Sequence, residues 1–65
     1  LTALLNRFLT QLDKESRILF LRRYWYGDSV GDIAQLLGMQ RNAVTVRLHR
    51  LREKLQDYLI KEELL

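Results

Sequence analysis

Apolar residues recur through the chain at intervals of three and four, the spacing that gathers side chains on one face of a helix. Residues 1–12 predict a first helix, with apolar positions at Leu1, Leu4, Leu5, Phe8, Leu9 and Leu12. A second helix is expected from Asp13, a good N-cap, to about Tyr26, with Gly27 just past its end. Its apolar residues are Ile18, Leu19, Phe20, Leu21, Tyr24, Trp25 and Tyr26. So broad an apolar surface predicts burial on more than one side of this helix.

The second half of the chain predicts a short helix, a glycine turn and a long final helix. Ser29 is expected to cap the short helix, and Asp32, three residues later, completes the Ser-x-x-Asp pattern of a capping box. Gly38 follows as a residue that tolerates the left-handed backbone of a tight turn. The final helix is expected from about Gln40 to about Ile60. Its apolar stripe consists of Val44, Leu48, Leu51, Leu55, Tyr58 and Leu59.

The stretch Ser29–Val44 contains the residues that a helix-turn-helix needs. Ala34 is a small residue in the first helix, where the second helix packs closely. Gly38 supplies the turn, and Val44 is an apolar residue that faces back from the second helix. Such a unit usually lays its second helix in the major groove of DNA. DNA binding is therefore the leading interpretation.

Length and composition narrow the class of protein. The 65 residues suit one domain near the lower size limit for an independent core. The absence of cysteine excludes disulfides and thiolate-bound metals and favours a reducing compartment. No apolar run approaches the roughly 20 residues that span a bilayer. We expect an all-α, four-helix domain over residues 1–65, with a C-terminal helix-turn-helix at about 29–55, no winged element and no cofactor. Because the chain begins with Leu1 rather than Met, we expect it to be a piece of a longer protein.

The positive charge of the chain gathers on the predicted final helix. The net charge is +3, and residues 40–54 contain five basic residues against a single acidic one. This is the electrostatic footprint of a protein that binds DNA. The plain alternative is an ordinary solvated helix face.

The face opposite the apolar stripe of the final helix carries groups that suit DNA bases. Its centre holds Asn42, Val46, His49 and Glu53, flanked by Thr45 and Arg50. Its borders carry Arg47 and Lys54 on one side and Arg41 and Arg52 on the other. Asparagine pairs with adenine, arginine pairs with guanine, and the methyl groups of threonine or valine contact the thymine methyl. We therefore expect this face to enter a groove while the border cations hold phosphates.

Three segments, taken in order, resemble region 4 of the bacterial sigma-70 family. Leu12–Ser29 is similar to the opening of that region. Asp32–Met39 is similar to its Glu-Ile-Ala…Leu-Gly-Met core, and Val44–Leu55 is similar to its recognition helix and basic continuation. The similarity is closest to the extracytoplasmic-function type (group IV) and covers nearly the whole chain.

The resemblance implies a function and the surfaces that perform it. Region 4 recognises the promoter −35 element, docks on the flap of the RNA polymerase β subunit through an apolar groove, and is often covered by an anti-sigma factor. The implied base contacts are Arg41, Asn42, Thr45, Val46, His49 and Arg50. The implied phosphate contacts are Arg47, Arg52 and the N-terminus of the third helix at Ser29 and Val30, whose free N–H groups suit an anion. The implied partner contacts are Phe20, Tyr24 and Trp25.

The sequence departs from the family pattern at three positions. Asp13 stands where proline is common, Gln40 where serine is common, and Ala43 where threonine is common. A capping or phosphate-binding hydroxyl is therefore missing, and the role of Gln40 stays open. Region 2 of the family, which melts and reads the −10 element, is absent, so we do not expect this piece to initiate transcription alone. We expect a monomer in the bacterial cytoplasm.

Two other functions remain open from the sequence. One is the effector domain of a response regulator or quorum-sensing regulator, which has a similar four-helix shape and dimerises through its last helix. Those domains usually start the recognition helix with Thr-Val-Lys, whereas this chain has Ala43-Val44-Thr45. The other is a protein-interaction domain sequestered by a partner such as an anti-sigma factor, which the broad apolar surface of the first two helices favours.

No catalytic or metal site is expected. Ser29 has no base placed to activate it, and His49 has no second histidine or cysteine to share a metal ion. Glu62 and Glu63 are neighbours in the sequence, and nothing positions them as a catalytic pair. The stretch Arg22–Tyr26 suggests base stacking, but we expect its aromatic residues to be core or part of a partner groove.

Overall fold

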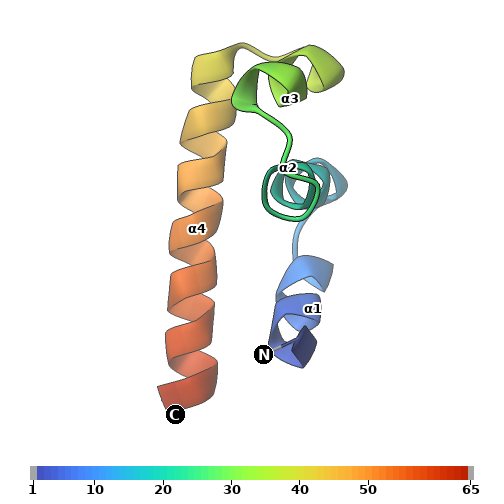
Figure 1. The fold of residues 1–65 in the computed structure, drawn as a ribbon. Coiled ribbons are helices and arrows are strands. Elements are labelled where there is room, and N and C mark those ends of the chain that lie inside the picture. Colours follow the sequence, from blue (N-terminus) through green and yellow to red (C-terminus); the bar gives the residue numbers. More distant parts are fainter. Residues whose placement is uncertain (1, 65) are drawn as a thin grey trace.

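Four helices make up the structure, a computed structural model that describes residues 2–64 and contains no strand in that range (Figure 1). They are α1 (Thr2–Thr10), α2 (Lys14–Tyr24), α3 (Val30–Leu37) and α4 (Arg41–Leu64). This arrangement confirms the predicted all-α fold class, and no winged element is present in the described residues. Leu1, which was expected in the first helix, lies outside them.

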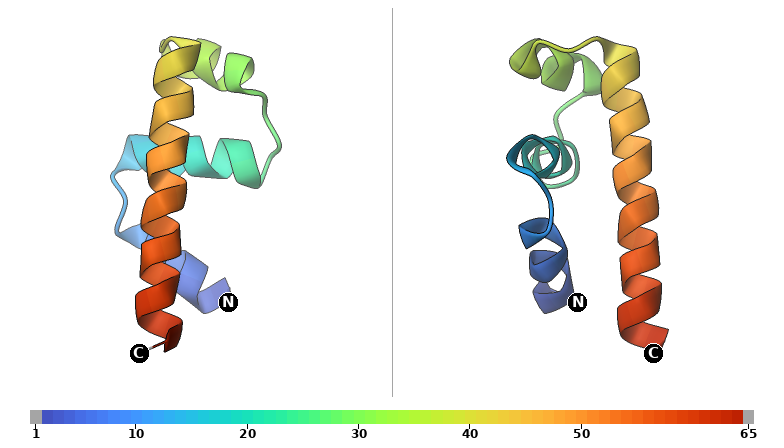
Figure 2. Two further views of the ribbon diagram at one scale, coloured as in Figure 1. Left: turned by 90° about the vertical axis from the view of Figure 1, so that its left-hand side faces the viewer. Right: turned by 180° about the vertical axis from the view of Figure 1, so that it is seen from behind.

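Helix α4 runs along the whole molecule, and the other three helices lie beside it. Its 24 residues span about 36 Å at 1.5 Å per residue, close to the 39 Å long dimension of the domain. Helix α3 lies beside the start of α4, α2 crosses its middle, and α1 lies beside its far half (Figures 1 and 2). None of the helices over residues 2–64 combines the length and apolar character needed to cross a membrane.

Helix α1 ends at Thr10, two residues before the predicted end at Leu12. The N–H groups of Gln11 and Leu12 donate to carbonyls only three residues back, at 3.1 and 3.2 Å. The chain therefore leaves the α-helix through a tighter, 3₁₀-like turn. The guanidinium of Arg17, one turn into α2, then donates to the carbonyls of Leu9 (3.2 Å) and Leu12 (3.1 Å). A side chain from the next helix therefore helps to satisfy the carbonyls at this end of α1.

Asp13 is the N-cap of α2, as predicted, and its side chain accepts a hydrogen bond from the N–H of Ser16 at 3.3 Å. The helix ends at Tyr24, with Trp25 as C-cap, so the expectation of a helix to about Tyr26 is two residues too long. The N–H groups of Trp25 and Tyr26 both bond the carbonyl of Leu21, which closes the last turn. Gly27 follows at φ 76°, in the left-handed region that favours glycine.

The helix-turn-helix forms as the sequence predicts. Ser29 caps α3 by accepting from the N–H of Asp32 at 3.0 Å, which is one of the two bonds of a capping box. Gly38 ends α3 in the left-handed conformation (φ 66°, ψ 35°), and its N–H bonds the carbonyl of Ala34. Helix α4 begins at Arg41 and continues to Leu64, past the expected end at about Ile60. No glycine or proline follows Gly38 in the sequence to stop it.

A single core joins all four helices. Its buried residues are Phe8, Leu12, Leu19, Phe20, Ile33, Ala34, Val44, Leu48 and Leu51. Leu19, Ile33 and Val44, from three different helices, have no exposed surface and lie at its centre. The ring of Phe8 meets Phe20 edge-on at 6.0 Å and Tyr58 at 5.6 Å, which holds α1 against the far half of α4. The core therefore fixes the start of α4 against α3 and its later turns against α1 and α2.

Candidate nucleic-acid interface

The outward face of the first half of α4 is polar and exposed. Its residues are Asn42, Thr45, Val46, His49 and Arg50, which we call the reading face. All five are exposed, and Val46 is an apolar residue with 47% of its surface in contact with solvent. His49 Nε2 lies 3.5 Å from Glu53 Oε1 one turn later. Val44 and Leu48 are buried on the opposite side of the helix, so the core fixes which face points outward.

Arg41, the first residue of α4, reaches back over α3. A Cβ atom placed on Gly31 would lie only 2.9 Å from Arg41 Nη2, so the guanidinium lies against the first turn of α3. That turn also holds Ser29 and Val30, whose N-terminal N–H groups were predicted to bind a phosphate. The structure therefore brings this cation and the predicted phosphate site together, at one edge of the reading face.

Two arginines were predicted to hold phosphates from opposite borders of the reading face. These residues, Arg47 and Arg52, have different surroundings in the structure. The guanidinium of Arg47 forms an ion pair with Glu15 and donates to Ser16 Oγ at 3.0 Å. It also lies 4.0 Å from Asp13 Oδ2. Arg52 is exposed, and it forms no ion pair with any side chain that the structure describes. Of these two arginines, Arg52 is therefore the one that projects to solvent with its charge unpaired.

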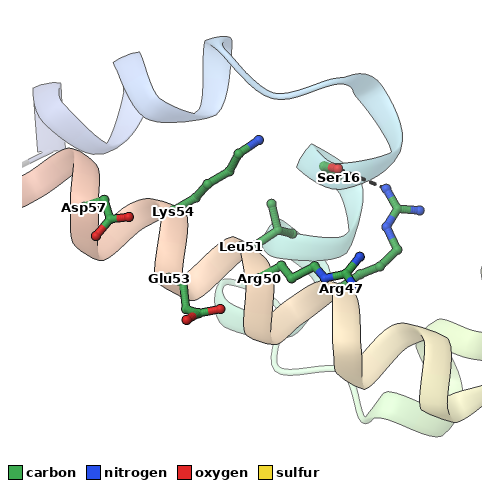
Figure 3. A pocket seen from close by; sticks show the side chains of 7 residues that line it. All are labelled: Ser16, Arg47, Arg50, Leu51, Glu53, Lys54 and Asp57. Carbon is green, nitrogen blue, oxygen red and sulfur yellow. Dashed lines mark hydrogen bonds between the residues drawn. The ribbon is translucent and has the colours of Figure 1, made fainter.

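A shallow hollow of about 420 Å³ lies between α4 and the start of α2 (Figure 3). Its lining residues are Ser16, Arg47, Arg50, Leu51, Glu53, Lys54 and Asp57. Lys54 extends from α4 toward the connection between α1 and α2, and Arg47 points toward Ser16 (Figure 3). The acidic side chains of Glu53 and Asp57 offset part of this positive charge.

Asp13, at the start of α2, is held in its charged form. Its pKa is lowered from the ordinary value of 3.8 by hydrogen bonding from the side chain of Ser16 and then from the Ser16 backbone N–H. The charge of Arg47 lowers the pKa further, to a smaller extent. Asp13 therefore carries a negative charge beside Arg47 at neutral pH.

An apolar groove of about 600 Å³ lies on another part of the surface. Its lining residues are Leu5, Asn6, Leu9, Phe20, Leu21, Tyr24, Trp25, Tyr26, Leu55 and Leu59. Trp25 is 76% exposed and Tyr26 is 64% exposed. The guanidinium of Arg22 lies 5.0 Å from the ring centre of Tyr26, which keeps that ring at the surface.

The predicted partner residues divide between the core and this groove. Phe20 is 6% exposed and belongs to the core, whereas Tyr24 is 45% exposed and packs on Phe20 at a ring distance of 4.9 Å. The expectation of burial on more than one side is wrong where α2 ends, because Tyr24 and the two residues after the helix, Trp25 and Tyr26, are exposed. Sequence reasoning missed Leu5 and Leu9 as groove residues, because their spacing alone does not separate a core position from a groove wall.

The fold and its polar surface define the class of protein: a helix-turn-helix DNA-binding domain. The family model described as Sigma-70, region 4 matches residues 2–55, which contain α1, α2, α3 and α4 as far as Leu55. The chain therefore belongs to the sigma-70 region 4 family, a non-catalytic DNA-binding family whose members act in promoter recognition and transcription initiation with RNA polymerase. Searches of curated proteins and of solved structures found no match.

Proposed function

We propose that this domain recognises the −35 element of a bacterial promoter by inserting the reading face of α4 into the major groove. The observation that carries the proposal is the exposure of all five reading-face residues at the end of the molecule where α3 and α4 meet. Asn42, Thr45 and Arg50 supply the hydrogen-bonding groups for bases, and Val46 supplies an apolar contact for a thymine methyl. His49 supplies a further polar contact.

Phosphates bind cations beside the reading face at two levels of α4. At the start of the helix, Arg41 acts together with the N-terminus of α3 at Ser29 and Val30. The position of Arg41 against Gly31 favours this phosphate role over the base contact that the sequence suggested. Arg52 binds a phosphate from its exposed position on α4.

The apolar groove binds RNA polymerase. An apolar helix of the β-subunit flap fits a groove whose walls are aromatic and leucine side chains from α1, α2 and α4. Trp25 and Tyr24 are the expected anchors, and Phe20 supports the groove from the core. An anti-sigma factor of similar amphipathic character competes for the same groove.

Membership of the sigma-70 region 4 family favours a sigma-factor domain over the effector domain of a response regulator. We further propose that the domain is monomeric, belongs to the extracytoplasmic-function type and acts in the bacterial cytoplasm. Light scattering tests the first point, because an effector domain that pairs through its last helix would appear as a dimer.

The test of −35 recognition is a selection of duplexes from a random pool, with the domain fused to the tip of the polymerase flap. The fusion raises the local concentration of the domain, because isolated domains of this kind often bind DNA weakly. We expect the selected duplexes to share a short common sequence and to lose affinity steeply as salt rises. A selected pool without a common sequence, or binding independent of salt, would contradict the proposal.

A further inference from the structure

We infer that Arg47 is a positioning residue for DNA recognition, and that its guanidinium ties α4 to the start of α2 instead of binding a phosphate. Through this tie, Arg47 sets the rotation of the reading face about the axis of α4. The inference rests on the proposed binding of DNA by α4. It changes the role of Arg47, whose guanidinium already contacts side chains at the start of α2.

Three polar groups at the start of α2 converge on this guanidinium. Arg47 Nη1 pairs with Glu15 Oε1, Arg47 Nη2 donates to Ser16 Oγ at 3.0 Å, and Asp13 Oδ2 lies 4.0 Å from Nη2. Arg47 and Ser16 are 31 residues apart in the sequence, so these contacts join two helices rather than two turns of one helix. We call this set of contacts, made by Arg47 with Asp13, Glu15 and Ser16, the brace.

The burial of Ser16 makes the brace specific. Ser16 is only 7% exposed, and no buried side-chain nitrogen or oxygen in the described part of the chain lacks a hydrogen-bond partner. A buried hydroxyl that loses one of its hydrogen bonds is less well satisfied, so Ser16 favours one placement of Arg47 over others. The lowered pKa of Asp13 keeps a further negative charge beside the guanidinium at neutral pH.

Directional contacts matter here because the core contacts between these helices are apolar. Leu19 of α2 packs among the buried residues that include Leu48 and Leu51 of α4. The core fixes which side of α4 faces outward, but because apolar attraction is non-directional, it specifies the fine rotation of the helix less sharply than an ion pair and a hydrogen bond do. A rotation of about 20° would move side-chain tips that lie roughly 5–6 Å from the helix axis by about 2 Å. That displacement exceeds what a hydrogen bond to a base tolerates.

Glu15→Gln gives the sharpest test, because the two roles of Arg47 predict opposite signs. If Arg47 binds a phosphate, removing a competing carboxylate frees the guanidinium and tightens DNA binding. If Arg47 belongs to the brace, the same change loosens α4 and weakens binding. We expect Glu15→Gln to weaken binding to the selected duplex about threefold to tenfold, and tighter or unchanged binding would overturn the inference.

The salt dependence of binding separates Arg47 from Arg52, its matched control on the same helix. Loss of one phosphate contact lowers the slope of log K against log[salt] by about 0.9. We expect Arg47→Gln to weaken binding about tenfold with the slope unchanged. We expect Arg52→Gln to lower the slope by about one. A fall in slope with Arg47→Gln equal to that with Arg52→Gln would overturn the inference.

A charge swap provides the rescue. Glu15→Arg and Arg47→Glu each place like charges together, and we expect each alone to weaken DNA binding by at least tenfold. The double variant restores the opposite pair with reversed positions and should recover at least part of the loss. If the double variant loses as much DNA affinity as the product of the two single losses, the brace is contradicted.

Thermal unfolding of the same variants without DNA keeps the two proposals distinguishable. We expect the stabilities of Glu15→Gln, Arg47→Gln and the double variant that carries both glutamines to show coupling between the two residues. If they show none, the brace itself is wrong. If the parent chain binds no duplex while the coupling is present, the proposed function fails instead.

Discussion

The reading face of α4 and the apolar groove beside α2 differ in how many helices build them. The reading face lies on one helix, so the 3.6-residue period alone brings its residues together. The groove takes its walls from α1, α2 and α4, so it exists only when three helices pack in one arrangement. Both surfaces depend on the same core, but only the groove depends on it for its shape. Substitutions should therefore affect the two surfaces separately unless they reach the core.

The largest expected effect comes from Leu19→Ala, which tests whether the two surfaces share one core. Leu19 has no exposed surface, and truncating such a leucine costs about 2–5 kcal/mol in the free energy of unfolding. Because a domain of this size has little stability to lose, DNA binding and groove binding should fail together. Chemical denaturation measures the loss.

Leu36→Ala is the control for that prediction. Leu36 is 56% exposed, so the substitution should change the unfolding free energy by no more than about 0.5 kcal/mol. A loss of DNA binding in Leu19→Ala with groove binding intact would show that the surfaces do not share the core.

Trp25→Ala should weaken binding at the apolar groove and leave DNA binding by the reading face unchanged. Trp25 is 76% exposed on the groove wall, and an aromatic anchor at the centre of an interface contributes about 2 kcal/mol or more. Calorimetry with a flap-tip helix should show a loss of at least thirtyfold, while affinity for the selected duplex stays within twofold. Ile60→Ala is the matched control, since Ile60 is an exposed apolar residue outside the groove lining. Equal losses in both variants would contradict the assignment of the groove.

Asn42→Ala should weaken DNA binding by the reading face and leave binding at the apolar groove unchanged. A side chain that bonds a base contributes about 1–3 kcal/mol, and its loss relaxes specificity at that position. Gln56→Ala is the control, because Gln56 is also an exposed amide on α4, beyond the reading face. Fluorescence anisotropy with single-base variants of the selected duplex measures both effects. If Asn42→Ala discriminates among bases as the parent does, Asn42 does not read the sequence.

Gly31→Ala tests whether Arg41 binds a phosphate together with the N-terminus of α3. Replacing a helical glycine with alanine favours the helix by up to about 1 kcal/mol, so α3 should become more stable. The new Cβ would meet Arg41 Nη2 at 2.9 Å and displace the guanidinium from the first turn of α3. We therefore expect higher thermal stability with weaker DNA binding. Stronger or unchanged DNA binding would argue against a phosphate site shared by Arg41 and α3.

The smallest expected effect is the pH dependence of the cap at Asp13. Its pKa in the folded state lies below the ordinary value of 3.8, so the carboxylate stabilises the fold above that value. This stabilisation is lost as the pH falls through the folded-state pKa. The stability difference between the parent and Asp13→Asn should therefore shrink as the pH falls below about 4. A difference that stays constant from neutral pH to acid would exclude this role for the Asp13 charge.

Features that depend on neighbouring residues could be predicted from the sequence. The caps at Asp13 and Ser29 and the left-handed turn at Gly38 each involve residues no more than four positions apart. The stripe that starts at Val44 and the exposed reading face follow from one helical period. These predictions were confirmed because no distant part of the chain is needed to form them.

Features that depend on contacts between helices could not be predicted. Where α1 ends, the side chain of Arg17 in α2 donates to the carbonyls of Leu9 and Leu12, which is a contact between helices. Trp25 is exposed, and the way α2 crosses α4 (Figure 2) is not specified by any local pattern. The contact of Arg47 with Glu15 joins residues 32 positions apart, whereas the helical spacing and the family resemblance had both assigned Arg47 to a phosphate.

The most direct test of the central claim is an NMR titration of the chain with the selected duplex, following every backbone amide. The account predicts chemical-shift changes concentrated at residues 29–31 and 41–52, with the groove residues Leu21 and Tyr24–Tyr26 unaffected. An unselected duplex of equal length should produce smaller changes at the reading face. Changes concentrated at the groove, or equal changes with both duplexes, would contradict a sequence-reading role for α4.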